Sequence, residues 1–474
     1  MLSYEDFFCD ICDLNALEKT ALEAFCGGNL GELFMEYRED EVLRIEDGHV
    51  QTANFNNKRG FGLRAFQEDA SVYSYSSSLT IPAMERAVSL VKTDFFSGNT
   101  SPVEIKNSDV GGSLYAPQRF LDSLSLENKI NFLKSIDAYA CSKSKDIIQV
   151  MATLASSWQV VSILRDSGEK YVDFRPLVRL TVSVVLEKGG TTEIGSYSGG
   201  GRHDYKPLIS ESVMKFYVDE ALRQANVKLN AIPAPVGEMP VVLGNGWTGI
   251  LLHEAIGHGL EGDAIRKETS SFHNLLGKYI AAPGVTVIDD GSIENCRGSI
   301  NMDDEGTPSQ RNVLIENGKL VGFMHDRMNA KLMGWPVTGN GRRESHEYIP
   351  VPRMTNTFML PGNNSFEDMI SCVKKGIFAK SFAGGQVDIV SGKFVFSASE
   401  AYLIENGSIT APVKGVMLIG DGPSILKKIS MVGNNFAMDP GVGTCGKDGQ
   451  WVPVGVGEPS VLIDGITVGG DKLG

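Results

Sequence analysis

The sequence Leu-Ile-Glu-Asn-Gly occurs at residues 314–318 and again at residues 403–407, and Val-Leu-Ile-Asp-Gly at residues 461–465 is a looser third copy. Each copy is an apolar run that ends in Asn-Gly or Asp-Gly, the residues that a type I′ hairpin turn requires at positive φ. A common need for hairpins explains the repetition as well as a duplication would. Three hairpin signals in the second half of the chain predict large antiparallel sheets there.

The first half of the chain mixes helical and strand-like patterns. Residues 1 to about 36 are predicted to be helical, with Gly27-Gly28 as the pair that stops the pattern. The turn signal Glu46-Asp47-Gly48 then predicts a hairpin whose returning strand includes residues 60–66. Further helices are predicted at residues 82–91, 126–141 and 212–225, and strands at residues 147–154, 159–164 and 177–186.

The proline-rich stretch Ala231-Ile232-Pro233-Ala234-Pro235 separates the two halves of the chain. Such stretches are typical of domain boundaries. We therefore predict an α+β protein, with an N-terminal mixed α/β domain at residues 1–230 and a C-terminal domain at residues 231–474. The second domain is expected to be dominated by antiparallel β-sheets and to carry the helix of a metal site.

The composition is that of a soluble globular protein with an acidic balance. Of 474 residues, 42% are hydrophobic and 22% are charged, and the formal net charge is −14. This charge argues against nucleic acid or an anionic membrane surface as the main partner. No apolar run approaches the ~18 residues of a spanning helix, and the seven cysteines are scattered, as is typical of reduced thiols. We expect a cytoplasmic protein, and we expect Asp303-Asp304-Glu305 to form a solvated acidic loop.

Residues 249–259, Gly-Ile-Leu-Leu-His-Glu-Ala-Ile-Gly-His-Gly, contain two histidines and a carboxylate typical of a metal-dependent hydrolase. The usual spacing is His-Glu-x-x-His, whereas His253, Glu254 and His258 form His-Glu-x-x-x-His. At ~100° per residue, the two imidazoles would lie about 140° apart on a regular α-helix and could not share one ion. A π-type turn, eased by the glycines beside His258, would bring them together. Three polar residues satisfied by hydrogen bonds in a core are the alternative.

Two histidines make an incomplete site, because a zinc hydrolase needs three protein ligands and an open position for water. Cys445 is the most suggestive third ligand, because the glycines around it allow close approach of the backbone. An isolated cysteine between glycines is otherwise a small apolar filler. The other candidates are His273, His325, His346, Asp263, Glu261 and Cys296.

Further motifs accompany the histidine pair in order along nearly the whole chain. They lie at residues 173–179, 303–308, 341–345, 353–357, 385–388 and 443–450. Together with the HExxxH motif and residues 259–263 behind it, they make the chain resemble the TldD branch of the TldD/PmbA family of metalloproteases.

The resemblance implies a metal centre in which His253, His258 and Cys445 hold one divalent ion, usually taken as zinc, and Glu254 is the general base. It also implies a dimer, formed either with a second copy or with a TldE/PmbA-like subunit that lacks the motif. In such a dimer the N-terminal domain would frame the assembly, and the site would face an internal cavity.

The function implied is that of a zinc-type metalloprotease that hydrolyses peptide bonds of small or unfolded peptides inside the dimer cavity. An extended peptide would bind by adding a strand to a sheet edge. Two alternatives stay open: a non-catalytic, metal-stabilised peptide-binding subunit of a protease complex, and a thiol hydrolase with Cys445 as nucleophile. The donor that stabilises the oxyanion stays open among His325, His346, Arg342 and Arg343. Trp451 would narrow the substrate path if it lines the cleft.

Overall fold

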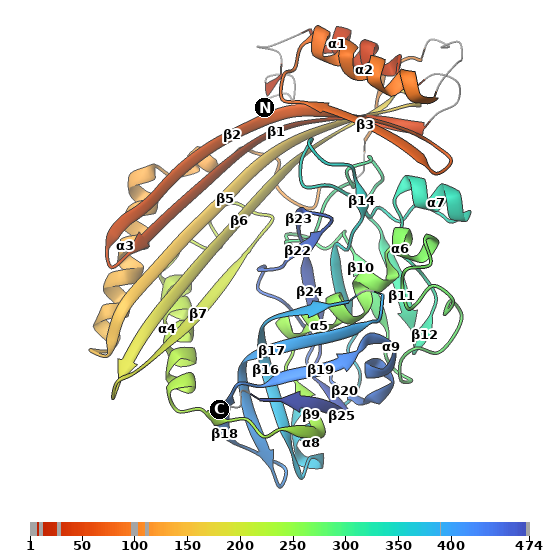
Figure 1. The fold of residues 1–474 in the computed structure, drawn as a ribbon. Helices are drawn as coiled ribbons and strands as arrows, with labels where there is room; N and C mark the ends of the chain where they lie inside the picture. The colour runs from red at the N-terminus through yellow and green to blue at the C-terminus, as the bar shows by residue number, and fades with distance from the viewer. Residues whose placement is uncertain are drawn as a thin grey trace.

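The computed structural model describes residues 7–8, 13–25, 30–95, 103–109, 113–388 and 390–470. A long curved β-sheet from the first half of the chain arches over a second body of smaller sheets and short helices (Figure 1). The two largest clusters of buried apolar side chains follow this arrangement, one drawn from residues 8–225 and the other from residues 241–468. The fold is α+β, as the sequence predicts. The division into domains at residue 231 stays a prediction.

The arch is a seven-stranded sheet in the order β3-β2-β1-β5-β6-β4, with β7 beside β6. All of its neighbours pair antiparallel except β4 and β6. The predicted hairpin between its first two strands is confirmed, because Asp47 and Gly48 turn with φ of 49° and 72°. The strands are β1 (Leu30–Glu46), β2 (His49–Gln67), β3 (Ala70–Ser76), β4 (Lys106–Asn107), β5 (Ile147–Arg165), β6 (Glu169–Lys188) and β7 (Thr191–Gly201).

Four helices accompany the arch and leave its concave side to the second body (Figure 1). They are α1 (Leu14–Leu22), α2 (Ile81–Phe95), α3 (Leu126–Lys143) and α4 (Glu211–Leu229). The side chains of Asp13, Ser125 and Ser210 accept a backbone N–H at the starts of α1, α3 and α4, so each helix begins at an N-cap. Helix α3 packs on β5 and β1, and α4 packs on β7 and β6. The three helices predicted after residue 80 are confirmed.

The prediction of a helix over residues 1 to about 36 is wrong in its second part. Helix α1 ends at Leu22, and the strand β1 already begins at Leu30. The stretch Leu33-Phe34-Met35 is buried on both sides of the sheet, so its continuous apolar pattern carries no strand alternation. The remainder of the predicted helix, residues 1–6, 9–12 and 26–29, lies outside the described residues. The separate strands predicted at 147–154 and 159–164 are parts of the single strand β5.

The second body holds two larger sheets. One has the order β12-β11-β10-β15-β24-β21 and the other the order β16-β9-β25-β19-β17-β18-β8, with β20 beside β25. Most pairs are antiparallel, and the parallel pairs are β15–β24, β9–β16 and β8–β18. The strands are β8 (Ile232–Pro233), β9 (Gly237–Leu243), β10 (Val287–Asp290), β11 (Arg311–Glu316), β12 (Lys319–Leu320), β13 (Gly341–Arg342), β14 (Val351–Pro352), β15 (Asn356–Met359), β16 (Lys375–Val387), β17 (Lys393–Glu405), β18 (Ser408–Lys414), β19 (Met417–Asp421), β20 (Ile429–Val432), β21 (Ala437–Met438), β22 (Thr444–Lys447), β23 (Gln450–Pro453), β24 (Gly455–Glu458) and β25 (Val461–Gly469).

Two of the three hairpins predicted in the second half are confirmed. Asn317-Gly318 joins β11 to β12 and Asn406-Gly407 joins β17 to β18, and all four residues have positive φ. The third prediction is wrong, because Asp464-Gly465 lies inside β25. There the strand pairs with β9 on both sides of an irregularity between Ile463 and Ile466. An Asp-Gly pair is also tolerated at a β-bulge, so the dipeptide alone does not define a turn.

The segment Asp303-Asp304-Glu305 is not a solvated loop, which corrects the prediction. All three side chains are buried, and Arg175 binds Asp304 while Arg64 binds Glu305. Both arginines come from the arch, so the acidic segment joins the second body to the sheet above it. Among the described residues, no helix is both long and apolar enough to cross a membrane.

Candidate metal centre

The histidine motif lies on one distorted helical segment of the second body. A 3₁₀ turn (η3, Trp247–Gly249) leads into a single α turn (α5, Ile250–Leu252), a π turn (η4, His253–Gly257) and a last 3₁₀ turn (η5, His258–Leu260). The backbone N–H of His258 donates to the carbonyl of His253, the five-residue step of a π-helix. The two imidazole rings therefore meet, with centroids 5.0 Å apart and planes at 86°.

The surroundings hold this turn tightly. Ile250, Leu251 and Ile256 are buried in the core of the second body, which anchors the apolar side of the segment. A Cβ on Gly257 would overlap the sulfur of Met354, and a Cβ on Gly422 would overlap the carbonyl of Ala255. Gly422 begins the short helix α9 (Gly422–Ile425), which contacts the π turn. The neighbouring elements thus approach the turn so closely that Gly257 and Gly422 leave no room for a Cβ atom.

Cys445 reaches the histidines from a hairpin formed by β22 and β23. Its side chain is buried at 3% exposure, and Sγ lies 3.3 Å from Nε2 of His258. One ligand atom from each of His253, His258 and Cys445 lies within 4.8 Å of the other two. Around a tetrahedral zinc ion, with bonds of ~2.0–2.3 Å, such atoms lie about 3.3–3.6 Å apart. The donor set therefore fits a divalent ion after a small contraction.

The thiol and the imidazoles influence each other's ionisation. Burial by itself would raise the pKa of the Cys445 thiol, but the neighbouring His253 and His258 hold that pKa well below its ordinary value. Burial by itself would lower the pKa of His258, but Glu261 and Cys445 raise it well above its ordinary value. The site thus favours a thiolate, which is the form of cysteine that binds zinc.

A second layer of charged side chains orients the donors. Oε2 of Glu261 lies 3.1 Å from Nδ1 of His258 and 2.9 Å from Nζ of Lys447. Burial opposes the charge of Glu261, but Lys447 and His258 lower its pKa to about 2. Nη2 of the buried Arg353 donates to the carbonyl oxygen of Cys445 at 2.6 Å. A carboxylate behind a histidine ligand fixes the ring and its tautomer, as in other metal centres.

Glu254 differs from the two histidines in its exposure. His253 and His258 are almost fully buried, whereas the Glu254 side chain retains 21% exposure. Its Oε2 lies 4.0 Å from Nε2 of His258. A carboxylate in this position borders the donor set without belonging to it and remains accessible to a small molecule such as water.

The other candidate ligands lie in different surroundings. Burial lowers the pKa of His325 to about 4, and both of its ring nitrogens lack a hydrogen-bond partner among the described residues. His346 faces Glu36, and His273 faces the carbonyl of Ser270. Burial raises the pKa of Cys296 to about 11. Among the described residues, the group formed by the two motif histidines and Cys445 is the one cluster able to hold a metal ion.

Lys447 and Arg353 lie in two of the motifs quoted from the sequence, but neither was predicted to be a member of this site. Lys447 lies two positions after Cys445 on β22, so strand alternation directs both side chains to one face. That alternation was a usable signal for Lys447. No local pattern indicated Arg353, because its contact with Cys445 spans 92 residues of chain.

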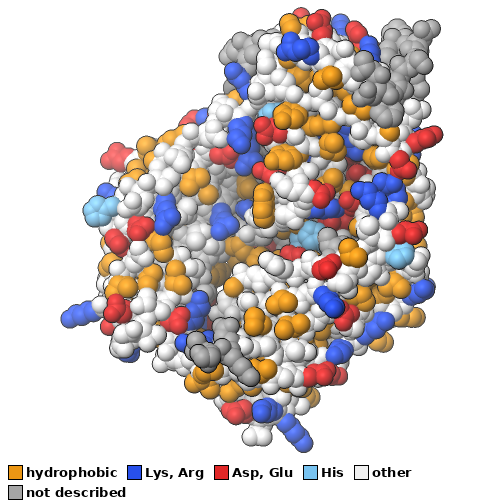
Figure 2. All heavy atoms as spheres, viewed as in Figure 1, with side chains coloured by type: hydrophobic (Ala, Val, Ile, Leu, Met, Phe, Trp, Pro, Cys, Tyr) orange, Lys and Arg blue, Asp and Glu red, His pale blue; other side chains and the backbone are white. Residues whose placement is uncertain are grey.

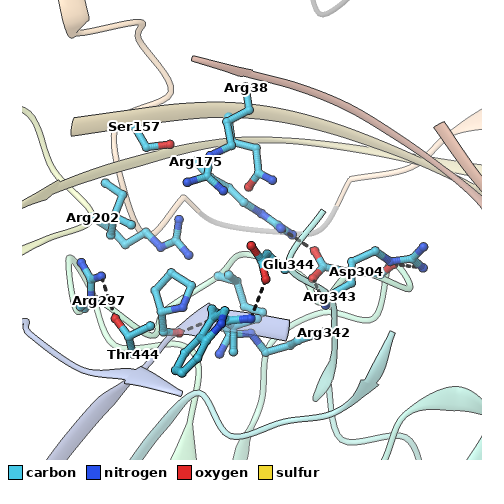
Figure 3. Close-up of a pocket in the computed structure, with 16 residues that line it drawn as sticks. Arg38, Ser157, Arg175, Arg202, Arg297, Asp304, Arg342, Arg343, Glu344 and Thr444 are labelled. Atoms are coloured by element: carbon cyan, nitrogen blue, oxygen red, sulfur yellow. Dashed lines mark hydrogen bonds and ion pairs between the residues drawn. The ribbon is translucent and has the colours of Figure 1, made fainter. Parts of the chain in front are cut away.

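A hollow opens between the arch and the second body, and lysine or arginine side chains are visible in it (Figure 2). The hairpin that carries Cys445 forms part of its wall, and Trp451, with 61% exposure, lines a cavity there. Figure 3 shows this cavity, with arginines from the arch and from the second body directed toward it.

Comparison with known proteins covers nearly the whole chain. Residues 31–93, 120–229 and 236–470 match the models for domain 1, the central domain and the C-terminal domain of the PmbA/TldA metallopeptidases. The chain is 47% identical to a metalloprotease TldD homolog of Haemophilus influenzae, over 93% of this chain and 92% of that protein. It is 31% identical to a metalloprotease of Methanocaldococcus jannaschii, over 91% of this chain and 95% of that protein.

A solved structure has the same fold. The crystal structure of TldE from Thermococcus kodakarensis superposes with a TM-score of 0.75 at 20% identity, over 96% of this chain and all of that one. At this identity the match shows the fold alone. The family models and the full-length relatives together show that the chain belongs to the PmbA/TldA metallopeptidase family.

Proposed function

We propose that this chain is a metal-dependent peptidase that hydrolyses short or unfolded peptides. In this proposal His253, His258 and Cys445 hold one divalent ion, most simply zinc, and Glu254 is the general base. The observation that carries the proposal is the meeting of three buried donor atoms, from two distant segments, within 4.8 Å. The names of the full-length relatives, which include the word metalloprotease, support it.

The residues of the site divide the chemistry between them. Bound to these donors, a divalent ion would supply Lewis-acid polarisation of the scissile carbonyl and acidification of a water molecule. Glu254, beside the donors and partly exposed, takes the proton of the attacking water at its carboxylate and later delivers it to the leaving amine. Glu261 holds the His258 ring in one orientation and forms an ion pair with Lys447. A thiolate ligand donates more charge than a third imidazole, so proton removal by Glu254 matters more here.

Peptide binding beside the hairpin β22–β23 fits this chemistry. The hairpin forms a two-stranded sheet, so among the described residues each of its strands has one edge without a strand partner. An extended peptide can pair with such an edge through backbone hydrogen bonds. This mode of binding selects unfolded segments and gives little specificity for side chains. We further propose action in the cytoplasm as a dimer, with a second copy or with a TldE/PmbA-like subunit. The shared fold with a solved TldE supports the latter pairing.

Replacement of Glu254 by Gln tests the proposal. The variant is expected to retain its metal by elemental analysis and to lose about 10²–10⁴-fold in peptide cleavage, the usual contribution of a general base. Glu294→Gln, at an exposed position that does not belong to the cluster, is the matched control and should cleave normally. Unchanged cleavage by Glu254→Gln would instead favour a metal-stabilised, non-catalytic subunit. Activity that survives metal removal would favour a thiol hydrolase.

A further inference from the structure

An arginine-rich cavity lies on the opposite side of the hairpin from the metal donors. It has a volume of about 210 Å³ and lies between the strands β1, β5 and β6 of the arch and the hairpin β22–β23. Six arginines line it, against two carboxylates, those of Asp304 and Glu344 (Figure 3). Such an excess of positive charge is notable in a chain with a formal net charge of −14.

Three of the six arginines are already neutralised. Arg175 binds Asp173 at 2.9 Å and Asp304 at 2.5 Å. Arg343 binds Glu32 at 2.7 Å, and Arg38 binds Asp40 at 2.8 Å. Carboxylates of the protein balance the charges of these three arginines. The excess positive charge of the cavity therefore comes from the other three.

The other three arginines form no direct ion pair with any described residue. Arg202, Arg297 and Arg342 are all buried, and no described carboxylate oxygen lies within 4.0 Å of their guanidinium nitrogens. Arg297 and Arg342 donate to the backbone carbonyls of Gly443 and Pro453, at 2.7 Å each, on the hairpin side of the cavity. Nε of Arg202 has no hydrogen-bond partner among the described residues, although the side chain is 96% buried.

Buried charge without a counter-ion is costly, so the arrangement favours the binding of an anion. Burial lowers the pKa of Arg297 to about 10, and the charges of Arg179 and Arg202 add to this effect. Burial also lowers the pKa of Arg342 to about 9, with Arg202 and Arg353 as further causes. The charge of Arg202 therefore acts against both Arg297 and Arg342, and an anion in the cavity that all three line would relieve this repulsion.

One residue that lines the cavity is adjacent in sequence to a proposed metal donor. Thr444 lines the cavity and accepts from Nη2 of Arg297, while the next residue, Cys445, is directed at His258. Adjacent residues of a strand point to opposite faces. The hairpin therefore presents the arginine cavity on one face and the metal donor on the other.

We propose that Arg202, Arg297 and Arg342 form a subsite for a carboxylate of the peptide substrate, its C-terminal group or an acidic side chain. The planar guanidinium fork matches a carboxylate with two parallel hydrogen bonds. The carboxylate of Glu344, held by the backbone N–H of Trp451 at 2.7 Å, also borders the cavity and disfavours a doubly charged anion such as phosphate. This inference rests on the proposed peptidase function and names its substrate class.

Three matched peptides test the subsite with the metal-loaded protein in its active assembly. One peptide has a free C-terminus, the second is its C-terminal amide, and the third is that amide with one Gln replaced by Glu. We expect kcat/KM to fall about tenfold or more on amidation if the subsite takes the C-terminus. A kcat/KM about tenfold higher for the Glu peptide than for the amide would show that the subsite takes an acidic side chain. Equal kcat/KM for all three peptides would overturn the subsite.

Substitutions test which arginines cause the preference for a peptide with a carboxylate over the neutral amide. Arg202→Gln should reduce the preference for the carboxylate peptide over its amide to within about twofold. Arg38→Gln is the control, because Arg38 lines the same cavity but is neutralised by Asp40. If a variant does not fold, Arg202→Lys keeps the charge without the fork and should show an intermediate preference. A full preference in Arg202→Gln would contradict the proposal.

Binding separates this proposal from the peptidase function. Titration calorimetry of the Glu254→Gln variant with the free and amidated peptides needs no cleavage, so it reports on the subsite even if no peptide is hydrolysed. We expect about tenfold tighter binding of the carboxylate peptide that the kinetics select. At constant ionic strength, an acetylated dipeptide with a free carboxylate should raise Tm more than its amide or inorganic phosphate does. Equal stabilisation by phosphate would exclude a carboxylate-specific site.

Discussion

Cys445 is the residue on which the proposed metal centre depends most. It is the one donor that does not belong to the histidine segment, and its Sγ lies 3.3 Å from His258. We expect Cys445→Ala to lose stoichiometric metal in elemental analysis, because two imidazoles alone leave the donor set incomplete. Cys296→Ala is the control, since Cys296 is not a member of the cluster. Full metal occupancy in Cys445→Ala would remove this cysteine from the ligand set.

Glu458 makes stability depend on pH. It is buried on β24, Oε1 has no hydrogen-bond partner among the described residues, and burial raises its pKa to about 8. The folded state therefore holds a proton that the unfolded state releases near its ordinary pKa of 4.5. The folded protein loses stability as pH rises between these two values, by about 1.4 kcal/mol for each unit of pKa difference.

Replacement by Gln isolates this effect. Glu458→Gln should melt at a higher temperature than the parent protein at about pH 8.5, and at nearly the same temperature at about pH 5, where the parent carboxyl is protonated in the folded state. Thermal melting of both proteins across this range is the measurement. Melting curves that stay parallel at every pH would show that Glu458 titrates normally.

At the residue scale, the sequence predicted which side chains form the buried cluster better than it predicted their supports, and metal binding by the cluster stays a prediction. The HExxxH spacing indicated a distorted turn, and the glycines around Cys445 made it the favoured third ligand. Glu261 was foreseen only as a ligand, whereas it orients His258. Arg353 was not foreseen, because its partner Cys445 is brought to it by the tertiary fold.

The π turn is the element that gives the site its geometry. Helix α9 contacts it through Gly422, where a Cβ would overlap the carbonyl of Ala255. Gly422→Ala should lower the free energy of unfolding by about 1–3 kcal/mol, the usual cost of overpacking. It should also weaken metal binding, measured by competition with a chromophoric chelator. Gly384→Ala is the control, because no atom lies within 4 Å of its added Cβ. Unchanged metal affinity in Gly422→Ala would show that α9 does not support the turn.

Among the elements, local turn chemistry was a good predictor and apolar pattern a poorer one. Asn317-Gly318 and Asn406-Gly407 form the hairpins that the sequence predicts, because few other residues adopt positive φ there. Asp464-Gly465 lies in a strand instead, because β9 supplies pairing on both sides of it. The start of β1 was predicted as helix, since residues buried on both faces show no alternation.

At the scale of the whole molecule, a buried ionic network joins the arch to the second body. Arg64 of β2 binds Glu305 at 2.7 Å, and Arg343 binds Glu32 of β1 at 2.7 Å. All four side chains are buried. The acidic segment was predicted to be solvated because its partner Arg64 is 241 residues away in the chain. Tertiary partners at such separations leave no local sequence signal.

Removal of one member of this network should be costly. Glu305→Ala leaves the Arg64 charge buried without its closest partner, and we expect a loss of about 3–5 kcal/mol in unfolding free energy. The double variant Arg64→Met/Glu305→Leu removes both charges and should recover most of that loss. Denaturant unfolding measures both variants, with the exposed Glu316→Ala as control. A double variant no more stable than Glu305→Ala would mean that lost packing, and not stranded charge, sets the cost.

The separation of the metal donors along the chain has a consequence for synthesis. His258 and Cys445 are 187 residues apart. At ~5–20 residues per second, a ribosome needs about 10–40 s to add this length. During that interval the nascent polypeptide has both imidazoles but not the sulfur. Under the proposed ligand set, a growing chain therefore lacks a complete metal site until its own hairpin has been translated and has docked.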